Sequence, residues 1–299
     1  MKETVLVFGG TSFIGMNLIR RLIASGYDVV TTYRPRSAKY EKLYAMFQNK
    51  IQYVEVDLCN MQTSIKNLET LDRCDYLYLA SWEGTNARDD EMVNERSANG
   101  LLQGLQYILD RFACKKVIQL GTQAEYGCPA GIVTEETACN PRSAYGKEKW
   151  RFYKMAEILC KQKNTNFIEY RIHSVFGKFR GGVLDSVISQ LKINKYCYMD
   201  TDCSQIFDYL YIHDCIDALL LGIQKDLHHT VYNISSGQKV TLKEYLEKIK
   251  TIIGPDCKIT YGHRKAEESP DFYFDSTRFR SETGWEPAYC FEDGIKDMI

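Results

Sequence analysis

The hydrophobic positions of the first 170 residues follow a repeating pattern. Short apolar or β-branched runs alternate with longer stretches whose apolar residues recur at helical spacing. The short runs predict strands at residues 5–8, 28–33, 51–56, 76–80, 116–120 and 167–170. The longer stretches predict helices at residues 13–24, 94–112 and 144–161. Strands that alternate with helices are typical of an α/β fold, in which crossover helices cover both faces of a doubly wound parallel sheet.

Beyond Arg171 the alternation loosens into glycine-containing loops, short mixed strands and two helical stretches. This pattern suits a smaller lobe that closes over a ligand. Residues 205–218 are expected to return to the first lobe. We therefore predict a cofactor-binding domain at 1–170 with a return segment at about 205–232, and a substrate-binding lobe built from 171–204 and 233–299.

Composition and charge narrow the function classes. The 299 residues are 44% hydrophobic, enough to bury a sizeable core. The net charge is −1, from 38 basic and 39 acidic residues, and no block of like charges could follow a phosphate backbone or a membrane surface. We therefore expect no nucleic-acid partner and no membrane partner.

The cysteines and the N-terminal residues point to the cytoplasm. The closest two of the eleven cysteines, Cys197 and Cys203, are six residues apart, so no CxxC motif exists. This spacing predicts reduced thiols used as small apolar side chains, without a metal site; the alternative is a metal site or a disulfide. The apolar run at 5–8 is too short for a signal sequence or a membrane span, which predicts a cytoplasmic protein.

A glycine-rich loop directly follows the first predicted strand and precedes a helix. It reads Gly-Gly-Thr-Ser-Phe-Ile-Gly from Gly9 to Gly15. Glycines let backbone amides approach a pyrophosphate, and the helix N-terminus adds a favourable dipole. The alternative is a glycine-rich turn without a ligand. The loop predicts a bound dinucleotide, held by Gly9, Thr11, Ser12, Phe13 and Ile14.

The end of the second predicted strand bears on which dinucleotide binds. An acidic residue there usually holds a ribose 2′-hydroxyl, whereas a 2′-phosphate needs cations. This chain has no acid in the segment but carries Arg34 and Arg36, which favours NADP over NAD. Alternatively, one or both arginines are surface residues. Asp57, at the end of the third predicted strand, either accepts a hydrogen bond from the adenine amino group or caps the next turn.

A tyrosine and a lysine with acid/base potential follow one another on a predicted helix. Tyr145 and Lys149 are four residues apart and therefore share one helix face. A lysine cation beside a phenol favours the phenolate and lowers a tyrosine pKa from about 10 toward working pH. Thr122 follows a predicted strand, where doubly wound sheets place their ligands. We predict Thr122 as hydrogen-bond donor, Tyr145 as proton carrier and Lys149 as electrostatic partner; the alternative is an exposed helical pair.

Taken together, these motifs resemble the extended short-chain dehydrogenase/reductase family, the NAD-dependent epimerase/dehydratase group that acts on nucleotide sugars. Further motifs fall in family order at 79–81, 93–94, 122–127, 171–177, 209–214, 232–237 and 284–287. The resemblance covers essentially the whole chain. It implies a Rossmann-type lobe for the dinucleotide, a smaller C-terminal lobe for a nucleotide sugar, and a homodimer formed through the helices at 94–112 and 144–161.

The same resemblance implies roles for individual residues. Thr122, Tyr145 and Lys149 correspond to the family's catalytic residues. Besides the positions above, cofactor contacts are implied for Leu58, Leu79, Ala80, Ser81, Asn94, Tyr145, Lys149 and His173. Substrate contacts are implied for Gln123, Ser174 and Arg264. Arg264 matches an arginine that binds the substrate pyrophosphate in relatives; the alternative is a surface arginine.

Several positions depart from the family pattern. Ser12 replaces the middle glycine of the loop, Ser174 replaces an asparagine and Phe207 replaces an arginine. Gln123 and Ala124 stand where sugar 4,6-dehydratases carry an Asp-Glu pair, which argues against elimination of water.

From these features we predict NADPH-dependent reduction of a keto group, at carbon 4, on a nucleotide-activated deoxysugar. The chain resembles ketoreductases such as CDP-abequose and CDP-paratose synthases in this respect. One alternative is an NAD-dependent nucleotide-sugar 4-epimerase. Another is a non-catalytic dinucleotide sensor that binds a partner protein.

Overall fold

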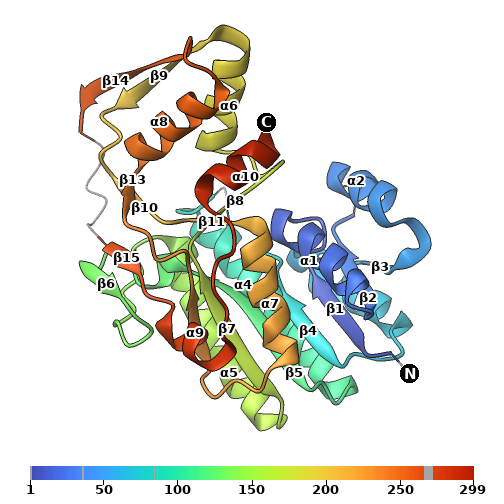
Figure 1. Cartoon of the computed structure of the whole chain (residues 1–299). Coiled ribbons are helices and arrows are strands. Elements are labelled where there is room, and N and C mark those ends of the chain that lie inside the picture. Colours follow the sequence, from blue (N-terminus) through green and yellow to red (C-terminus); the bar gives the residue numbers. More distant parts are fainter. Residues whose placement is uncertain (1, 36, 84, 86, 266–271) are drawn as a thin grey trace. The chain divides into compact units, whose positions relative to one another are not determined.

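A computed structural model of the chain describes residues 2–35, 37–83, 85, 87–265 and 272–299 (Figure 1). The chain divides into two compact units. The first, called here the sheet unit, comprises Met1–Gly127, Ala138–Arg171 and Leu219–Tyr232. The second unit comprises Cys128–Thr137, Ile172–Ala218 and Asn233–Ile299.

A seven-stranded sheet with the order β12-β7-β5-β4-β1-β2-β3 organises the sheet unit. Its strands are β1 (Thr4–Phe8), β2 (Asp28–Tyr33), β3 (Gln52–Glu55), β4 (Tyr76–Leu79), β5 (Lys116–Thr122), β7 (Asn166–Ile172) and β12 (Val231–Ile234). Strand β1 pairs in parallel with both β2 and β4. The strand order therefore reverses between β1 and β4, the topological switch point of a doubly wound fold. The predicted α/β class and Rossmann-type sheet are confirmed.

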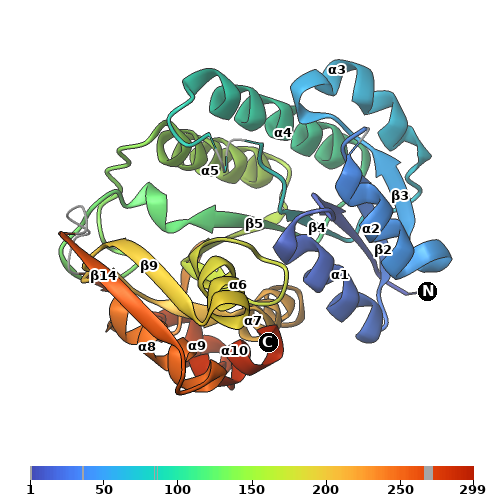
Figure 2. The same cartoon turned by 90° about the horizontal axis from the view of Figure 1, so that it is seen from above.

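Helices cover both faces of this sheet. They are α1 (Phe13–Ala24), α2 (Ala38–Phe47), α3 (Met61–Ser64), α4 (Glu91–Arg111), α5 (Ala144–Gln162) and the C-terminal half of α7 (Ile212–Gln224). Figure 2 shows α4 and α5 on the face opposite α1. Short 3₁₀ turns η1 (Gln48–Lys50), η2 (Leu58–Asn60), η3 (Ile65–Thr70) and η5 (Gln123–Glu125) complete the connections.

The central strands are apolar on both faces because helices bury both. Leu6 and Phe8 of β1 face one side of the sheet and Val5 and Val7 face the other, and all four are fully buried. Such continuous apolar runs are typical of parallel sheets covered on both sides. The helix at 94–112 begins earlier than its apolar pattern predicts, at Glu91, because the Asp90 side chain caps it by accepting from the Val93 amide at 3.0 Å.

In its described residues, the second unit contains four pairs of short strands and four whole helices, besides the first half of α7. The strands pair as β6 (Gly131–Val133) with β15 (Phe272–Phe274), β8 (Ser174–Phe176) with β11 (Tyr209–Tyr211), β9 (Tyr196–Thr201) with β14 (Lys258–Arg264), and β10 (Ile206–Phe207) with β13 (Val240–Thr241). The helices are α6 (Val183–Asn194), α8 (Leu242–Ile253), α9 (Thr277–Thr283) and α10 (Phe291–Met298).

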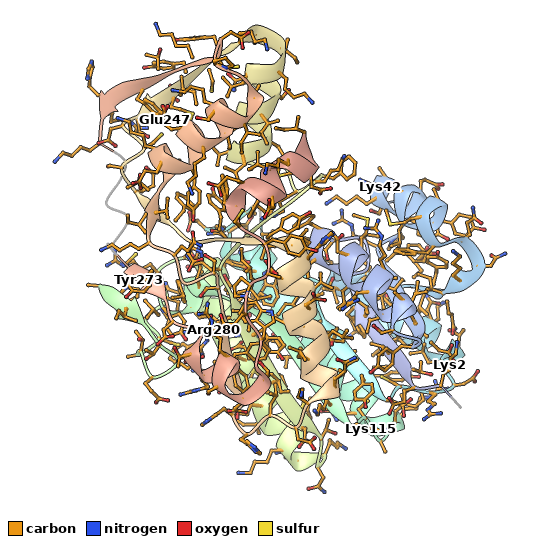
Figure 3. All side chains as sticks on the ribbon, in the orientation of Figure 1. Lys2, Lys42, Lys115, Glu247, Tyr273 and Arg280 are labelled. Carbon is orange, nitrogen blue, oxygen red and sulfur yellow. The ribbon has the colours of Figure 1, made fainter. Side chains whose placement is uncertain are left out.

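Aromatic packing and buried polar contacts hold the second unit together. The Tyr245 and Phe291 rings lie 4.4 Å apart and join α8 to α10. The Trp285 indole donates to the Asp214 carbonyl at 3.2 Å, and the Asp214 carboxylate accepts from the Ala288 amide at 2.8 Å. On α8, Glu247 accepts from the Tyr261 hydroxyl of β14 at 2.8 Å; Figure 3 labels Glu247.

The division of the chain differs from the sequence-based boundaries in two places. Residues 128–137 belong to the second unit because β6 pairs there with β15. Residues 205–218 also belong to the second unit, because β11 pairs with β8, and the chain re-enters the sheet unit only at Leu219. Within the described part of the chain, no helix is long and apolar enough to cross a membrane.

Candidate functional site

The glycine-rich loop has the close backbone packing that its sequence predicts. Gly9 adopts φ +97°, and a Cβ there would lie 2.8 Å from the backbone of Ser81. A Cβ on Gly15 would lie 2.3 Å from the Gly9 carbonyl oxygen. Side chains at both positions are therefore excluded. The loop keeps the backbone of β1, the start of α1 and the end of β4 in mutual contact.

Ser12 at the middle glycine position has a structural explanation. Its side chain caps α1 by accepting from the Gly15 amide at 3.0 Å. The first turn of α1 contains no acidic residue, and a helix start leaves amides directed beyond its end. This end of the sheet therefore fits an anionic pyrophosphate. The cofactor contacts assigned to Gly9, Thr11, Ser12, Phe13 and Ile14 stay predictions.

At the end of β2, Arg34 meets an acid that the local sequence does not reveal. The Arg34 guanidinium lies 3.1 Å from the Glu83 carboxylate, which also accepts from the Cys59 thiol and lies 3.6 Å from Arg96. Glu83 follows β4 and therefore belongs to another loop at the same edge of the sheet. The segment at the end of β2 contains no acidic residue, but Glu83 from the loop after β4 lies beside it. Arg36 lies outside the described residues.

Asp57 and Asn94 both hold local structure. Asp57 caps η2 by accepting from the Cys59 amide at 3.0 Å, which is the second of the two roles that its position allowed. The buried Asn94 amide accepts from the Trp82 indole at 2.9 Å and donates to the carbonyls of Ala87 and Asp90. Asn94 thus fixes the loop between β4 and α4. Cofactor contacts at Asp57, Leu58, Leu79, Ala80, Ser81 and Asn94 stay predictions.

The three predicted acid/base residues lie in the sheet unit and are almost fully buried. Thr122, Tyr145 and Lys149 have exposed fractions of 6%, 7% and 4%. Their backbones are brought together where α5 starts against η5: a Cβ on Gly146 would lie 2.4 Å from the Ala124 carbonyl oxygen. The exposed helical pair considered as an alternative is therefore excluded by burial.

Trp82 links the tyrosine and the lysine. The Lys149 ammonium lies 4.4 Å from the centre of the Trp82 ring, and the Tyr145 ring packs edge-on against the same indole at 6.1 Å. Lys149 also donates to the Leu120 carbonyl of β5 at 2.7 Å. Burial lowers the Lys149 pKa to about 8, although the nearby carboxyl groups of Glu125 and Glu169 oppose this effect.

The remaining predicted contacts are in the second unit, apart from Gln123. His173 lies 2.8 Å through Nδ1 from the Asp208 carbonyl, and burial lowers its pKa. Ser174 pairs with Tyr209 in the short β8–β11 ladder, and Arg264 is an exposed residue at the end of β14. Gln123 of η5 has a buried Oε1 with no hydrogen-bond partner among the described residues. Their roles toward cofactor and substrate stay predictions.

Sequence reasoning missed several residues that surround the site. Trp82 and Glu83 lie in a loop without a recognisable pattern, and Glu125 and Glu169 are acids inside otherwise apolar segments. Glu169 in the run Phe-Ile-Glu-Tyr-Arg-Ile carried a signal, because a carboxyl group in a buried strand requires a partner. The partner itself could not be identified without the fold.

With the loop, the switch point and the buried residues in place, the chain can be compared with known proteins. The sequence profile described as the NAD dependent epimerase/dehydratase family matches residues 5–235. The chain belongs to this family.

Relatives within the family catalyse different reactions. The chain is 24% identical to a UDP-glucose 4-epimerase from Lactobacillus helveticus, covering 99% of this chain and 94% of the relative. It is 23% identical to a CDP-abequose synthase from Salmonella muenchen, covering 100% and 98%.

A solved structure shares the fold. It is UDP-glucuronic acid 4-epimerase from Bacillus cereus in complex with UDP-glucuronic acid and NAD. It superimposes with a TM-score of 0.82 at 21% identity, over 99% of this chain and 97% of that one.

Proposed function

We propose that this chain catalyses the NADPH-dependent reduction of a keto group, at carbon 4, on a nucleotide-activated deoxysugar. The observation that carries the proposal is the burial of Tyr145 and Lys149 around Trp82, beside the turn that begins at Thr122. Burying an ammonium group destabilises the folded protein because the charge loses its hydration. A lysine kept in such a place one helical turn from a tyrosine therefore suggests a role in the reaction. The same burial argues against a non-catalytic dinucleotide sensor.

Each residue has one role in the proposed reaction. A bound NADPH would supply the hydride for the keto carbon. The Tyr145 hydroxyl donates its proton to the carbonyl oxygen, and the Lys149 cation stabilises the phenolate that remains. The Thr122 hydroxyl donates a hydrogen bond to the same oxygen as negative charge develops on it. Proton and hydride together convert the ketone into an alcohol.

The residues after Thr122 support reduction rather than dehydration. Elimination of water needs an additional acid and base next to the sugar, and Gln123 and Ala124 carry no ionisable group. The similarity to a CDP-abequose synthase along the whole chain is in keeping with this reading. Gln123, Ser174 and Arg264 are the proposed substrate contacts.

The choice of NADPH rests on Arg34. A guanidinium at the end of β2 suits a 2′-phosphate. Glu83 weakens this argument, because its carboxylate already pairs with Arg34 and would repel a phosphate. The solved relative from Bacillus cereus contains NAD. NADPH therefore requires that the phosphate replace Glu83 as the partner of Arg34.

A second function, nucleotide-sugar 4-epimerisation with NAD, is favoured by the epimerase relatives and by the Arg34–Glu83 pair. In that reaction the hydride removed from carbon 4 returns to the opposite face of the same carbon, so no cofactor is consumed.

We also expect a homodimer through α4 and α5, where Met92, Met155 and Ile158 are exposed.

The deciding experiment is a screen of nucleotide-activated 4-keto sugars and 4-hydroxy sugars with NADPH and with NADH. Reduction predicts oxidation of NADPH in a 1:1 ratio with product and no turnover of the 4-hydroxy sugars. Interconversion of 4-hydroxy epimers without a net absorbance change would overturn the reductase proposal in favour of the epimerase. Tyr145→Phe serves as the matched control and should lose turnover in either case.

A further inference from the structure

The sheet unit buries three ionisable side chains that the proposed chemistry does not use. Glu125 of η5 and Glu169 of β7 are fully buried, and Arg171 of β7 is 4% exposed. The Arg171 Nε donates to both carboxyl groups, at 3.1 Å each. The Oε2 atoms of the two carboxyl groups therefore converge on one buried nitrogen atom. Glu125 and Glu169 are called the carboxyl pair below.

The carboxyl pair is built into the backbone that carries Thr122. Glu125 accepts from the Thr122 amide at 2.8 Å, while the Thr122 hydroxyl accepts from the Ala124 amide in the reciprocal capping box. Gly121, just before Thr122, leaves room for the second carboxyl group, because a Cβ there would lie 2.9 Å from the Glu169 carboxyl. Replacing either carboxyl group would therefore remove a contact with the backbone that carries Thr122.

Two buried carboxyl groups that meet at one nitrogen atom favour a shared proton. Two ionised carboxylates have no hydrogen to share and repel each other strongly in a buried site. Glu169 also accepts from the Gln119 amide at 2.9 Å, so each carboxyl group has another donor besides Arg171. One proton in the pair leaves one negative charge, which acts on two cations, Arg171 and Lys149.

We propose that Glu125 and Glu169 share one proton and one negative charge, and that this charge keeps Lys149 a cation while the pair positions Thr122. The two residues are positioning residues and do not touch the reacting atoms. The statement about the shared proton stands on the burial of both carboxyl groups and on the bonds that both accept from the Arg171 Nε. The statement about the role of Lys149 in the reaction rests on the proposed function.

The groups around Lys149 support this assignment. The Lys149 ammonium contacts the Trp82 ring and the Leu120 carbonyl. Among the described residues, the charged groups that act on its pKa are the carboxyl pair, which raise it against the effect of burial. Without the pair, burial would act alone.

Other titratable groups face the pair rather than Lys149. Burial raises the pKa of both carboxyl groups, most strongly that of Glu169. Tyr126 stacks on Arg171, whose guanidinium also lies 5.5 Å from the Tyr153 ring. Burial raises the pKa of the Cys139 thiol to about 11, so this neighbour stays neutral near pH 7.

The shared proton is tested on the intact protein by infrared spectroscopy. A buried protonated carboxyl group has a C=O stretch that an ionised one lacks, so wild type should show this band at pH 7. Glu169→Gln and Glu125→Gln should each abolish it, because the single acid that remains ionises beside Arg171. Glu157→Gln, on the same helix as Lys149, is the control and should keep the band. A wild-type spectrum without the band would overturn the shared proton.

The shared charge is tested by titrating Lys149 with carbon NMR of labelled lysine, assigned with Lys149→Met. Each single glutamine variant keeps one carboxylate, so the Lys149 titration should stay near its wild-type pH. Glu125→Gln/Glu169→Gln removes the charge and should move the titration down by about one to two pH units, as expected for a charge about 6 to 12 Å away at an effective dielectric constant of 20.

Two outcomes would contradict the proposal. Single variants that shift Lys149 as far as the double variant would mean that both carboxyl groups are ionised. A double variant with an unmoved Lys149 would mean that the pair has no influence on it. If the double variant does not fold, the infrared band and the single variants still decide. Neither readout depends on turnover, so an inactive enzyme with the predicted band and titration would refute only the proposed function.

Discussion

Two groups of arginines and glutamates in the sheet unit have the same chemistry but opposite surroundings. The buried cluster consists of Arg171 with Glu125 and Glu169, whose side chains are 4%, 0% and 0% exposed. The exposed cluster consists of Arg34, Glu83 and Arg96, whose side chains are 58%, 29% and 44% exposed. In both clusters an arginine meets an acid from a different part of the chain.

The difference in surroundings determines what each cluster can do. In the interior the dielectric constant is low and charges interact strongly. The carboxyl pair can therefore retain a proton and raise the pKa of Lys149. At the surface, water and salt screen the same pairs, which contribute about 0–1 kcal/mol. Pairs this weak can exchange partners when an anion arrives. The buried cluster is thus suited to set protonation, and the exposed cluster to respond to a ligand.

The largest expected effect is at the buried end of the site. Tyr145→Phe removes the proposed proton donor, and we expect kcat to fall by about 100- to 10,000-fold. Dinucleotide affinity should fall far less than kcat, because the exposed cluster and the glycine loop are intact and Tyr145 is one cofactor contact among several. Stopped-flow turnover and fluorescence titration of NADPH measure the two quantities. Full activity in this variant would remove Tyr145 from the chemistry.

Replacing the arginine in each cluster tests the comparison directly. Arg171→Met leaves the carboxyl pair without its cation, and we expect it to destabilise the protein by about 3–5 kcal/mol. Arg34→Met removes an exposed pair and should cost less than about 1 kcal/mol. Urea unfolding of both variants gives the free energies of unfolding. Equal losses would show that burial does not separate the clusters.

The pH and salt dependence of turnover should also separate them. Because the Lys149 pKa is about 8, the cation is present below that pH and is lost above it. We therefore expect kcat/KM for reduction to fall above about pH 8. The pH at which kcat/KM falls should not change with ionic strength, because the Lys149 ammonium is buried. NADPH affinity should weaken with added salt, because salt screens Arg34 and Arg96. A fall in kcat/KM whose pH moves with salt would place the titrating group at the surface.

The smallest expected effect concerns cofactor choice. Glu83→Gln removes the carboxylate that pairs with Arg34, so NADPH should bind several-fold more tightly while NADH changes little. Dissociation constants for both cofactors check this, with Glu55→Gln at the end of β3 as the control. Tighter NADH binding in the Glu83 variant would instead indicate that Arg34 does not face the 2′-position.

The sequence alone determined the features that depend on neighbours along the chain. Apolar runs in β1, β4 and β5 identified the sheet because such runs are stable only when helices bury both faces. The loop from Gly9 to Gly15 and the spacing of Tyr145 and Lys149 are local patterns with local physical meaning. The seventh strand, β12, was missed, because the short run Val-Tyr-Asn-Ile gives little periodicity to recognise.

Tertiary structure alone decided which charges meet. Glu125 and Arg171 are 46 residues apart, and they meet because β5 and β7 are neighbours in the sheet. Arg34 and Glu83 are 49 residues apart and meet beyond β2 and β4, which lie on either side of β1. Whether a charge is buried, and therefore whether it holds a proton or a partner, depends on the packing of segments distant in sequence, which no local pattern encodes.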